Sequence, residues 1–204
     1  MQTYENFEKL KDNKKNIIIN AGLEVFSNYG YDQASTDIII KRANISKGAL
    51  FHYFENKENF FIYLFHYATN ELVKKVNPNP PIKKMDIFDY LSYITKQKIE
   101  ILAEYPFLMH FVMKAYEENY QLLKDKGKID FFENYQNNSN FISQEIDFST
   151  LKDGIPKEVF LSWVGMISQG FVQNYTKFPV EYRAQLIDDL FLLYDELKKN
   201  FRKD

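Results

Sequence analysis

The spacing of apolar residues constrains the fold of this chain more than any other feature of its sequence. Between residues 14 and 30, apolar side chains recur at i, i+3, i+7 and i+11, which places Ile18, Ala21, Val25 and Tyr29 on one face of a helix. Gly30 follows, a typical residue for ending a helix. Alternating runs bounded by Asn-Gly or Asp-Gly turns do not occur. The sequence therefore predicts an all-α fold.

A proline cluster divides the chain. Residues 77–81 read NPNPP, and three prolines in four residues cannot continue a helix. With 204 residues the chain is long enough for two units. We expect an N-terminal domain over 1–57, a connecting helix over 57–76 and a larger helical domain over 77–204. Within the larger domain, apolar spacing and prolines predict helices over 84–104, 107–124, 128–147, 156–176 and 180–202.

Two short helices joined by a tight turn are predicted in the N-terminal domain. Thr36 can cap the first of them, and Asp37 suits the positive end of its dipole. Asn44 tolerates the left-handed backbone of a tight turn, after which Ser46 can cap a helix reading SKGALFHYF. This arrangement indicates a helix-turn-helix unit, whose second helix enters the major groove of DNA.

The second short helix has an inner and an outer face. Leu50 and Phe54 are four residues apart and are expected to point into the domain. The residues expected on the outer side are suited to DNA: Ser46 and Lys47 to phosphate, Gly48 to close approach, and Ala49 to a thymine methyl group. Phe51, His52 and Tyr53 are expected to fall partly on the same side.

The stretch TDIIIKRANISKGALFHYFENKENFF, residues 36–61, resembles the signature of TetR-family transcriptional repressors. The resemblance covers about residues 13–64, with departures at Ile40, Asn44, Ala49 and Phe51. It implies a three-helix DNA-binding domain followed by a larger ligand-binding and dimerisation domain. It also implies roles for individual residues: phosphate contacts for Thr36, Ser46, Lys47, Tyr53 and Lys57, and positions at or near the bases for Ala49, Phe51 and His52. The spacing alone would make Lys57 a solvated residue.

The last two predicted helices are the expected dimer surface, since one two-turn helix reads too few bases and a regulator of this type needs two copies. Both carry apolar stripes, and pairing them would form a four-helix bundle, as the resemblance also implies. The alternative is that these stripes form a core within one chain. The candidate interface residues are Val159, Met166, Phe171, Leu186, Leu190, Leu193 and Leu197.

An effector pocket is expected in the larger domain, mainly because the resemblance implies one. Aromatic residues and methionines there suit an adaptable apolar cavity, and the scarcity of cations among them favours an apolar small molecule over a polyanion. The candidate pocket residues are Phe88, Phe107, Phe111, Met113, Tyr116, Phe131 and Trp163.

Other functions lack support in the sequence. The chain has no cysteine, its three histidines show no metal-ligand spacing, and no phosphate-binding or nucleophile motif occurs. We therefore expect no catalytic residues, no metal and no cofactor. Neither a signal peptide nor a membrane-spanning stretch is visible, which predicts a cytoplasmic protein. The alternative function is a helical protein-interaction module that does not read DNA.

Overall fold

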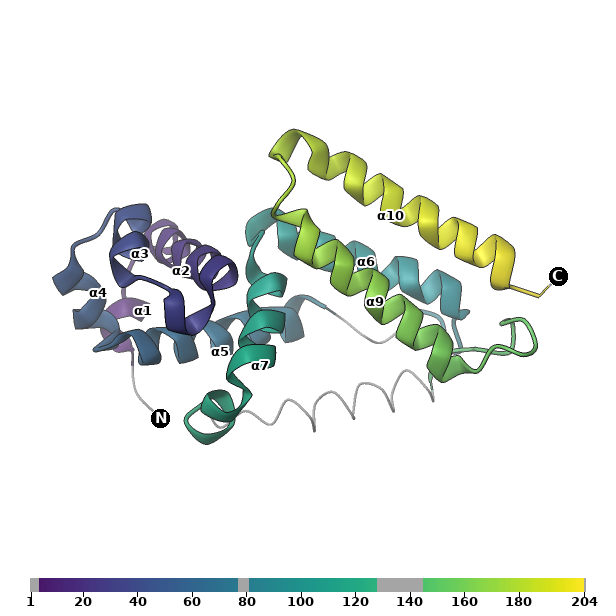
Figure 1. Ribbon diagram of the computed structural model, residues 1–204, viewed down its shortest axis with the longest axis horizontal. Helices are drawn as coiled ribbons and strands as arrows, with labels where there is room; N and C mark the ends of the chain where they lie inside the picture. Colours follow the sequence, from purple (N-terminus) through teal and green to yellow (C-terminus); the bar gives the residue numbers. More distant parts are fainter. Residues whose placement is uncertain (1–3, 77–80, 128–144, 204) are drawn as a thin grey trace. The chain divides into compact units, whose positions relative to one another are not determined.

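The computed structural model describes residues 4–76, 81–127 and 145–203, and in these ranges the chain is built from helices with no named strand. Figure 1 shows their arrangement. The all-α prediction is confirmed, while most of the helix predicted over 128–147 lies outside the described residues. In chain order the helices are α1 (Glu5–Glu8), α2 (Asp12–Gln33), α3 (Thr36–Ala43), α4 (Lys47–Phe54), α5 (Lys57–Lys75), α6 (Ile87–Glu104), α7 (Leu108–Asp125), α9 (Lys157–Tyr175) and α10 (Val180–Phe201).

The helices form two compact units. The first consists of residues 1–73 together with 107–129, and the second of 74–106 together with 130–204. Helix α7 joins the first unit because it packs against α2. Packing thus groups α7 with the N-terminal helices, while the functional division that the sequence suggests at residue 77 remains a prediction.

The core of the first unit is aromatic. Phe26 on α2 contacts Phe61 on α5, with ring centroids 5.1 Å apart, and Phe61 contacts Phe111 on α7 at 5.5 Å. All three side chains are at most 1% exposed. Gly30 ends the regular part of α2 as predicted, since its φ of 71° and ψ of 174° leave the helical region.

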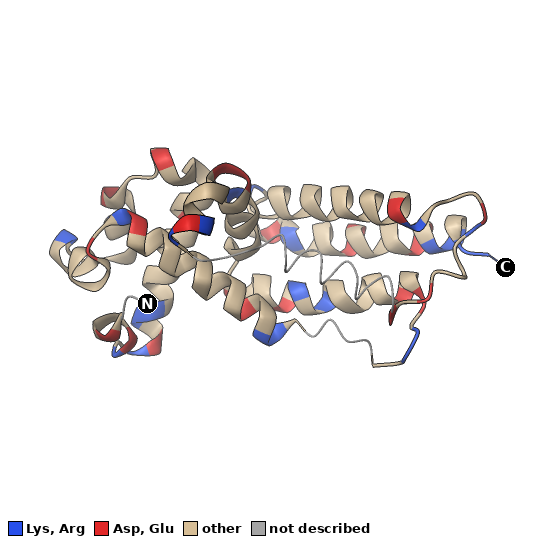
Figure 2. Cartoon of the chain, turned by 90° about the horizontal axis from the view of Figure 1, so that it is seen from below, with Lys and Arg blue, Asp and Glu red and all other residues tan. Residues whose placement is uncertain are grey.

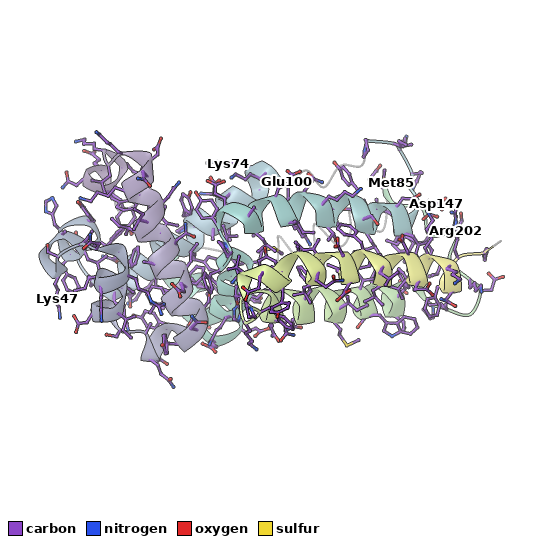
Figure 3. All side chains as sticks on the ribbon, turned by 90° about the horizontal axis from the view of Figure 1, so that it is seen from above. Lys47, Lys74, Met85, Glu100, Asp147 and Arg202 are labelled. Carbon is purple, nitrogen blue, oxygen red and sulfur yellow. The ribbon has the colours of Figure 1, made fainter. Side chains whose placement is uncertain are left out.

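The second unit contains α6, α9 and α10, which lie side by side (Figure 1). Asp86 organises one end of it. One carboxylate oxygen of Asp86 accepts a hydrogen bond from the backbone N–H of Phe88 at 2.9 Å, and the other accepts one from the Thr150 hydroxyl and lies 3.6 Å from Arg202 Nε. The start of α6 and the end of α10 are thereby joined to the segment around Asp147, as Figure 3 shows for Met85, Asp147 and Arg202.

Every helix in the described ranges is too short or too polar to span a lipid bilayer. No cluster of three or more His, Cys, Asp or Glu residues in the same part of the chain could hold a metal ion.

Candidate nucleic-acid interface

Asn44 makes the turn between α3 and α4. Its backbone is left-handed, with φ 49° and ψ 51°, as the sequence predicts. The N–H of Ile45 donates to the carbonyl of Ile40 at 3.1 Å, and the N–H of Asn44 donates to the carbonyl of Lys41 at 3.4 Å. This pair of bonds is the Schellman arrangement that satisfies the last carbonyls of a helix. The turn therefore closes α3 and sets the direction in which the chain enters α4.

Hydroxyl side chains begin both short helices. The prediction for α4 is confirmed, because Ser46 Oγ accepts a hydrogen bond from the N–H of Ala49 at 3.1 Å. The prediction for α3 is wrong by one residue. Ser35, with an extended backbone, is the cap and accepts from the N–H of Asp37 at 3.2 Å, while Thr36 is the first helical residue. Thr36 is left half-buried, with its hydroxyl not used as the cap.

The inner face of α4 packs as predicted. Leu50 is 1% exposed and Phe54 is fully buried. The Phe54 ring lies 4.7 Å from that of Phe7 and 4.5 Å from that of Phe60. These contacts attach α4 to α1 and α5, so the orientation of its outer face is set by the core of the unit.

The outer face of α4 is polar at its start. Ser46, Lys47, Gly48 and His52 are exposed, and Figure 3 shows Lys47 projecting away from its unit. A Cβ atom added to Gly48 would have only Ser46 Oγ, 4.0 Å away, as a neighbour. Packing within the chain therefore does not require a glycine at position 48. Close approach of a binding partner to the backbone would require one. The remaining predicted contacts are half-buried: Ala49, Phe51 and Tyr53.

Two polar contacts on this surface are weak. Lys47 Nζ lies 3.1 Å from a carboxylate oxygen of Asp37, and both side chains are exposed. His52 Nε2 lies 3.2 Å from Asn6 Nδ2, also at the surface. Exposed pairs of this kind contribute at most about 1 kcal/mol, so a phosphate could displace either contact. In Figure 2 acidic and basic residues are interspersed along the N-terminal helices.

Lys57 is not the solvated residue that its spacing suggests. Its ammonium group donates to the backbone carbonyls of Tyr31, Asp32 and Ala34 at 2.9, 3.3 and 3.4 Å, and lies 4.7 Å from the centre of the Tyr31 ring. These carbonyls belong to the end of α2 and the residue after it, where a cation is favourable. Lys57 therefore joins α5 to α2. Its contact with a DNA phosphate remains a prediction, in which the ammonium group would also keep these carbonyl contacts.

Helix α1 was missed by sequence reasoning. It is only four residues long, yet its Phe7 is fully buried and lies 5.7 Å from the ring of Tyr53. Tyr4 and Phe7, three residues apart at helical spacing, were the available signal. Through Phe7 and the Asn6 contact to His52, the N-terminal segment supports the outer residues of α4 from behind.

The predicted pocket residues are divided between the two units. Phe107, Phe111, Met113 and Tyr116 belong to the first, where Phe111 is 1% exposed in the aromatic core. Phe88 and Trp163 belong to the second, where both pack with Phe160 at ring distances of 5.3 and 6.5 Å. Phe131 lies outside the described residues.

The predicted interface residues differ in exposure. Val159, Met166 and Leu193 are 40%, 59% and 40% exposed, which leaves them available to a partner. Leu190 is only 6% exposed and lies in the core of the second unit, so the intrachain alternative holds for this residue. The other three are half-buried: Phe171, Leu186 and Leu197.

The geometry of α2 to α4 is that of a helix-turn-helix protein, and comparison with known proteins agrees. Residues 18–64 match the family described as bacterial regulatory proteins, tetR family. The helix-turn-helix region of this chain is therefore similar to that of tetR-family regulators.

Curated relatives match over part of the chain. An uncharacterized HTH-type transcriptional regulator, YhgD of Bacillus subtilis, is 31% identical over 64 residues, which cover 31% of this chain and 34% of YhgD. The fatty acid metabolism regulator protein of Bacillus subtilis is 28% identical over 86 residues, covering 42% and 44% of the two chains. The matches thus span less than half the length of either relative.

Solved structures share the fold over most of the chain. A TetR family transcriptional regulator from Chloroflexus aurantiacus is similar over 98% of both chains, with a TM-score of 0.65 and 18% identity. The transcriptional regulator FadR from Bacillus subtilis, solved in complex with stearoyl-CoA, covers 85% of this chain and 96% of its own, with a TM-score of 0.50 and 20% identity. At these identities the likeness extends to the fold alone.

Proposed function

We propose that this protein is a cytoplasmic transcriptional repressor that binds a palindromic DNA operator as a homodimer and is released from it by a mainly apolar small molecule. The main observation in support of this proposal is the outer face of α4. A capped helix start with an exposed Ser-Lys-Gly entry, held on a closed aromatic core, suits phosphate contact and groove entry.

The homodimer is supported by exposed apolar residues on α9 and α10. Met166 and Leu193 are large, apolar and exposed, and a Cβ atom at Gly165 or Gly170 would meet nothing within 4 Å. An apolar surface of this kind, with room for close approach, favours a helix-on-helix contact with a second copy. Two copies would present two α4 helices to the two half-sites of an operator.

An apolar effector is supported by the character of the second unit and by the relatives. Its core is built from aromatic and aliphatic side chains, with Phe88 and Trp163 among them. One relative regulates fatty acid metabolism by its name, and one solved neighbour holds stearoyl-CoA. If effector and operator favour different dimer geometries, each weakens binding of the other by the same free energy.

The experiment that tests this function is selection of random DNA duplexes by the purified protein, followed by sequencing. We expect a two-fold symmetric motif to be enriched. A Lys47→Ala/Tyr53→Phe variant, which removes a charge and a hydroxyl but keeps the ring that packs on Phe7, should lose the enrichment, whereas Lys177→Ala, at an exposed position in the second unit, should keep it. Failure of the unmodified protein to enrich any motif would favour the alternative, a protein-interaction module.

Gly48 allows a second test of the same surface. Gly48→Ala should leave the melting temperature unchanged or raise it, because alanine is the better helix former and the new methyl group has space within the chain. Operator affinity should fall by about tenfold or more, since the methyl group would lie between α4 and the DNA backbone. Thermal unfolding followed by circular dichroism and a gel-shift titration measure the two quantities. Unchanged operator affinity would show that DNA does not approach at Gly48.

A further inference from the structure

Lys98 lies on the core-facing side of α6. The same side carries Leu91, Thr95 and Leu102, which are 5%, 8% and 2% exposed. Lys98 follows Thr95 by three residues and precedes Leu102 by four, the spacings that place residues on one helix face. Its side chain is largely covered, unlike that of the neighbouring Lys96, which is exposed. A lysine thus occupies a position where the helix otherwise presents buried side chains.

No hydrogen bond or ion pair holds the Lys98 ammonium group in the described part of the chain. Every carboxylate on α6, α9 and α10 is exposed, so none of these helices supplies a buried counterion. The apolar surroundings lower the pKa of Lys98, because loss of water disfavours the charged form. The other described lysines whose side chains show no partner are all exposed: Lys11, Lys14, Lys41, Lys83, Lys152 and Lys177.

Thr95, one helical turn before Lys98 on α6, is hydrogen-bonded to a phenol of another helix. Thr95 Oγ donates to the hydroxyl oxygen of Tyr194 on α10 at 3.3 Å, inside the unit. Burial raises the pKa of Tyr194, so this phenol keeps its proton. In that bond the Tyr194 oxygen is the acceptor, and its own O–H remains a possible donor. The hydroxyl pair of Thr95 and Tyr194 is thus a polar feature of the helix face that also carries Lys98.

We propose that Lys98 recognises the headgroup of the effector, which is therefore an amphiphile with an apolar body and a single anionic headgroup such as a carboxylate. The proposal rests on the effector-binding function proposed above and narrows its ligand class. A single covered cation matches one negative charge, and a polyanion would leave further charges without partners. The anion would supply the counterion that the described chain does not, and the surrounding core would cover the apolar body.

The test is a binding titration with two probes of equal chain length, decanoate and decan-1-ol, kept below the concentrations at which they aggregate. Trp163 is the only tryptophan and lies in the same unit, so its fluorescence reports binding there without any DNA present. We expect decanoate to bind at least tenfold more tightly than decan-1-ol. Lys98→Met should weaken decanoate binding by about 10- to 100-fold and leave decan-1-ol binding unchanged. Lys98→Arg should retain most of the preference for decanoate.

Lys96→Met is the matched control, since it removes the same charge from an exposed position two residues away. It should alter neither probe. In the absence of probe, Lys98→Met should also raise the melting temperature, because it removes a covered charge and keeps an unbranched side chain. Equal binding of the two probes, or decanoate binding that survives Lys98→Met, would overturn the proposal. Failure of operator selection with decanoate binding intact would count against the repressor function and leave the anion site standing.

Discussion

Replacing Met166 and Leu193 together with glutamate is expected to convert the protein to a monomer and to reduce operator affinity by at least about 100-fold. In a two-fold dimer each substitution occurs twice, so four carboxylates would enter a contact surface that is now apolar. Burying an unpaired carboxylate costs several kcal/mol, and association would be lost. A monomer would present one α4 helix and could hold only one half-site. Light scattering after size-exclusion chromatography and a gel-shift titration measure the two effects.

Ile82→Glu provides the control for the added charge. Ile82 is 66% exposed and lies outside α9 and α10, so its replacement should leave both the mass and operator binding unchanged. Because Met166 and Leu193 are 59% and 40% exposed, the double variant should retain its helical circular dichroism spectrum. A double variant that is folded and still dimeric would place the interface elsewhere.

The parts of the fold that depend on neighbouring residues were predictable from the sequence. Helix spacing, the left-handed Asn44 and the Ser46 cap are local features, and the structure reproduces each of them. The same local signals set the inward orientation of Leu50 and Phe54. The one cap that was misplaced lies where two hydroxyl residues are adjacent, and the choice between them depends on backbone angles that the residue types do not fix.

Features that depend on tertiary packing were not predictable in the same way. Spacing showed Lys57 as an exposed residue, because the carbonyls that hold it lie 23 to 26 positions earlier in the chain. The burial of Leu190 depends on contacts among helices of the second unit. An apolar stripe in the sequence has the same pattern whether it packs against its own chain or against a partner. The short helix α1 is held by Phe7, whose partners are on α4 and α5. In each case the deciding contact is remote in sequence.

Replacing the two phenylalanines of α4 by alanine should affect different properties. We expect Phe54→Ala to reduce mainly stability and Phe51→Ala to reduce mainly operator affinity. Phe54 is fully buried against Phe7, Phe60 and Tyr63, with ring distances of 4.7, 4.5 and 5.1 Å. Phe54→Ala should lower the free energy of unfolding of the first unit by about 3–5 kcal/mol, since a large cavity would open against side chains of α1 and α5. Urea unfolding followed by circular dichroism measures this loss.

Phe51→Ala removes the same side chain from the same helix, one turn earlier and half-buried on the outer side. Its effect on stability should be about 1 kcal/mol or less, whereas operator affinity should fall by about tenfold. The pair separates two reasons why a helix carries aromatic residues, because Phe54 holds α4 in place, whereas Phe51 is predicted to face the DNA. A large stability loss in Phe51→Ala with unchanged DNA binding would make both rings structural. The DNA contact would then rest on the polar start of the helix alone.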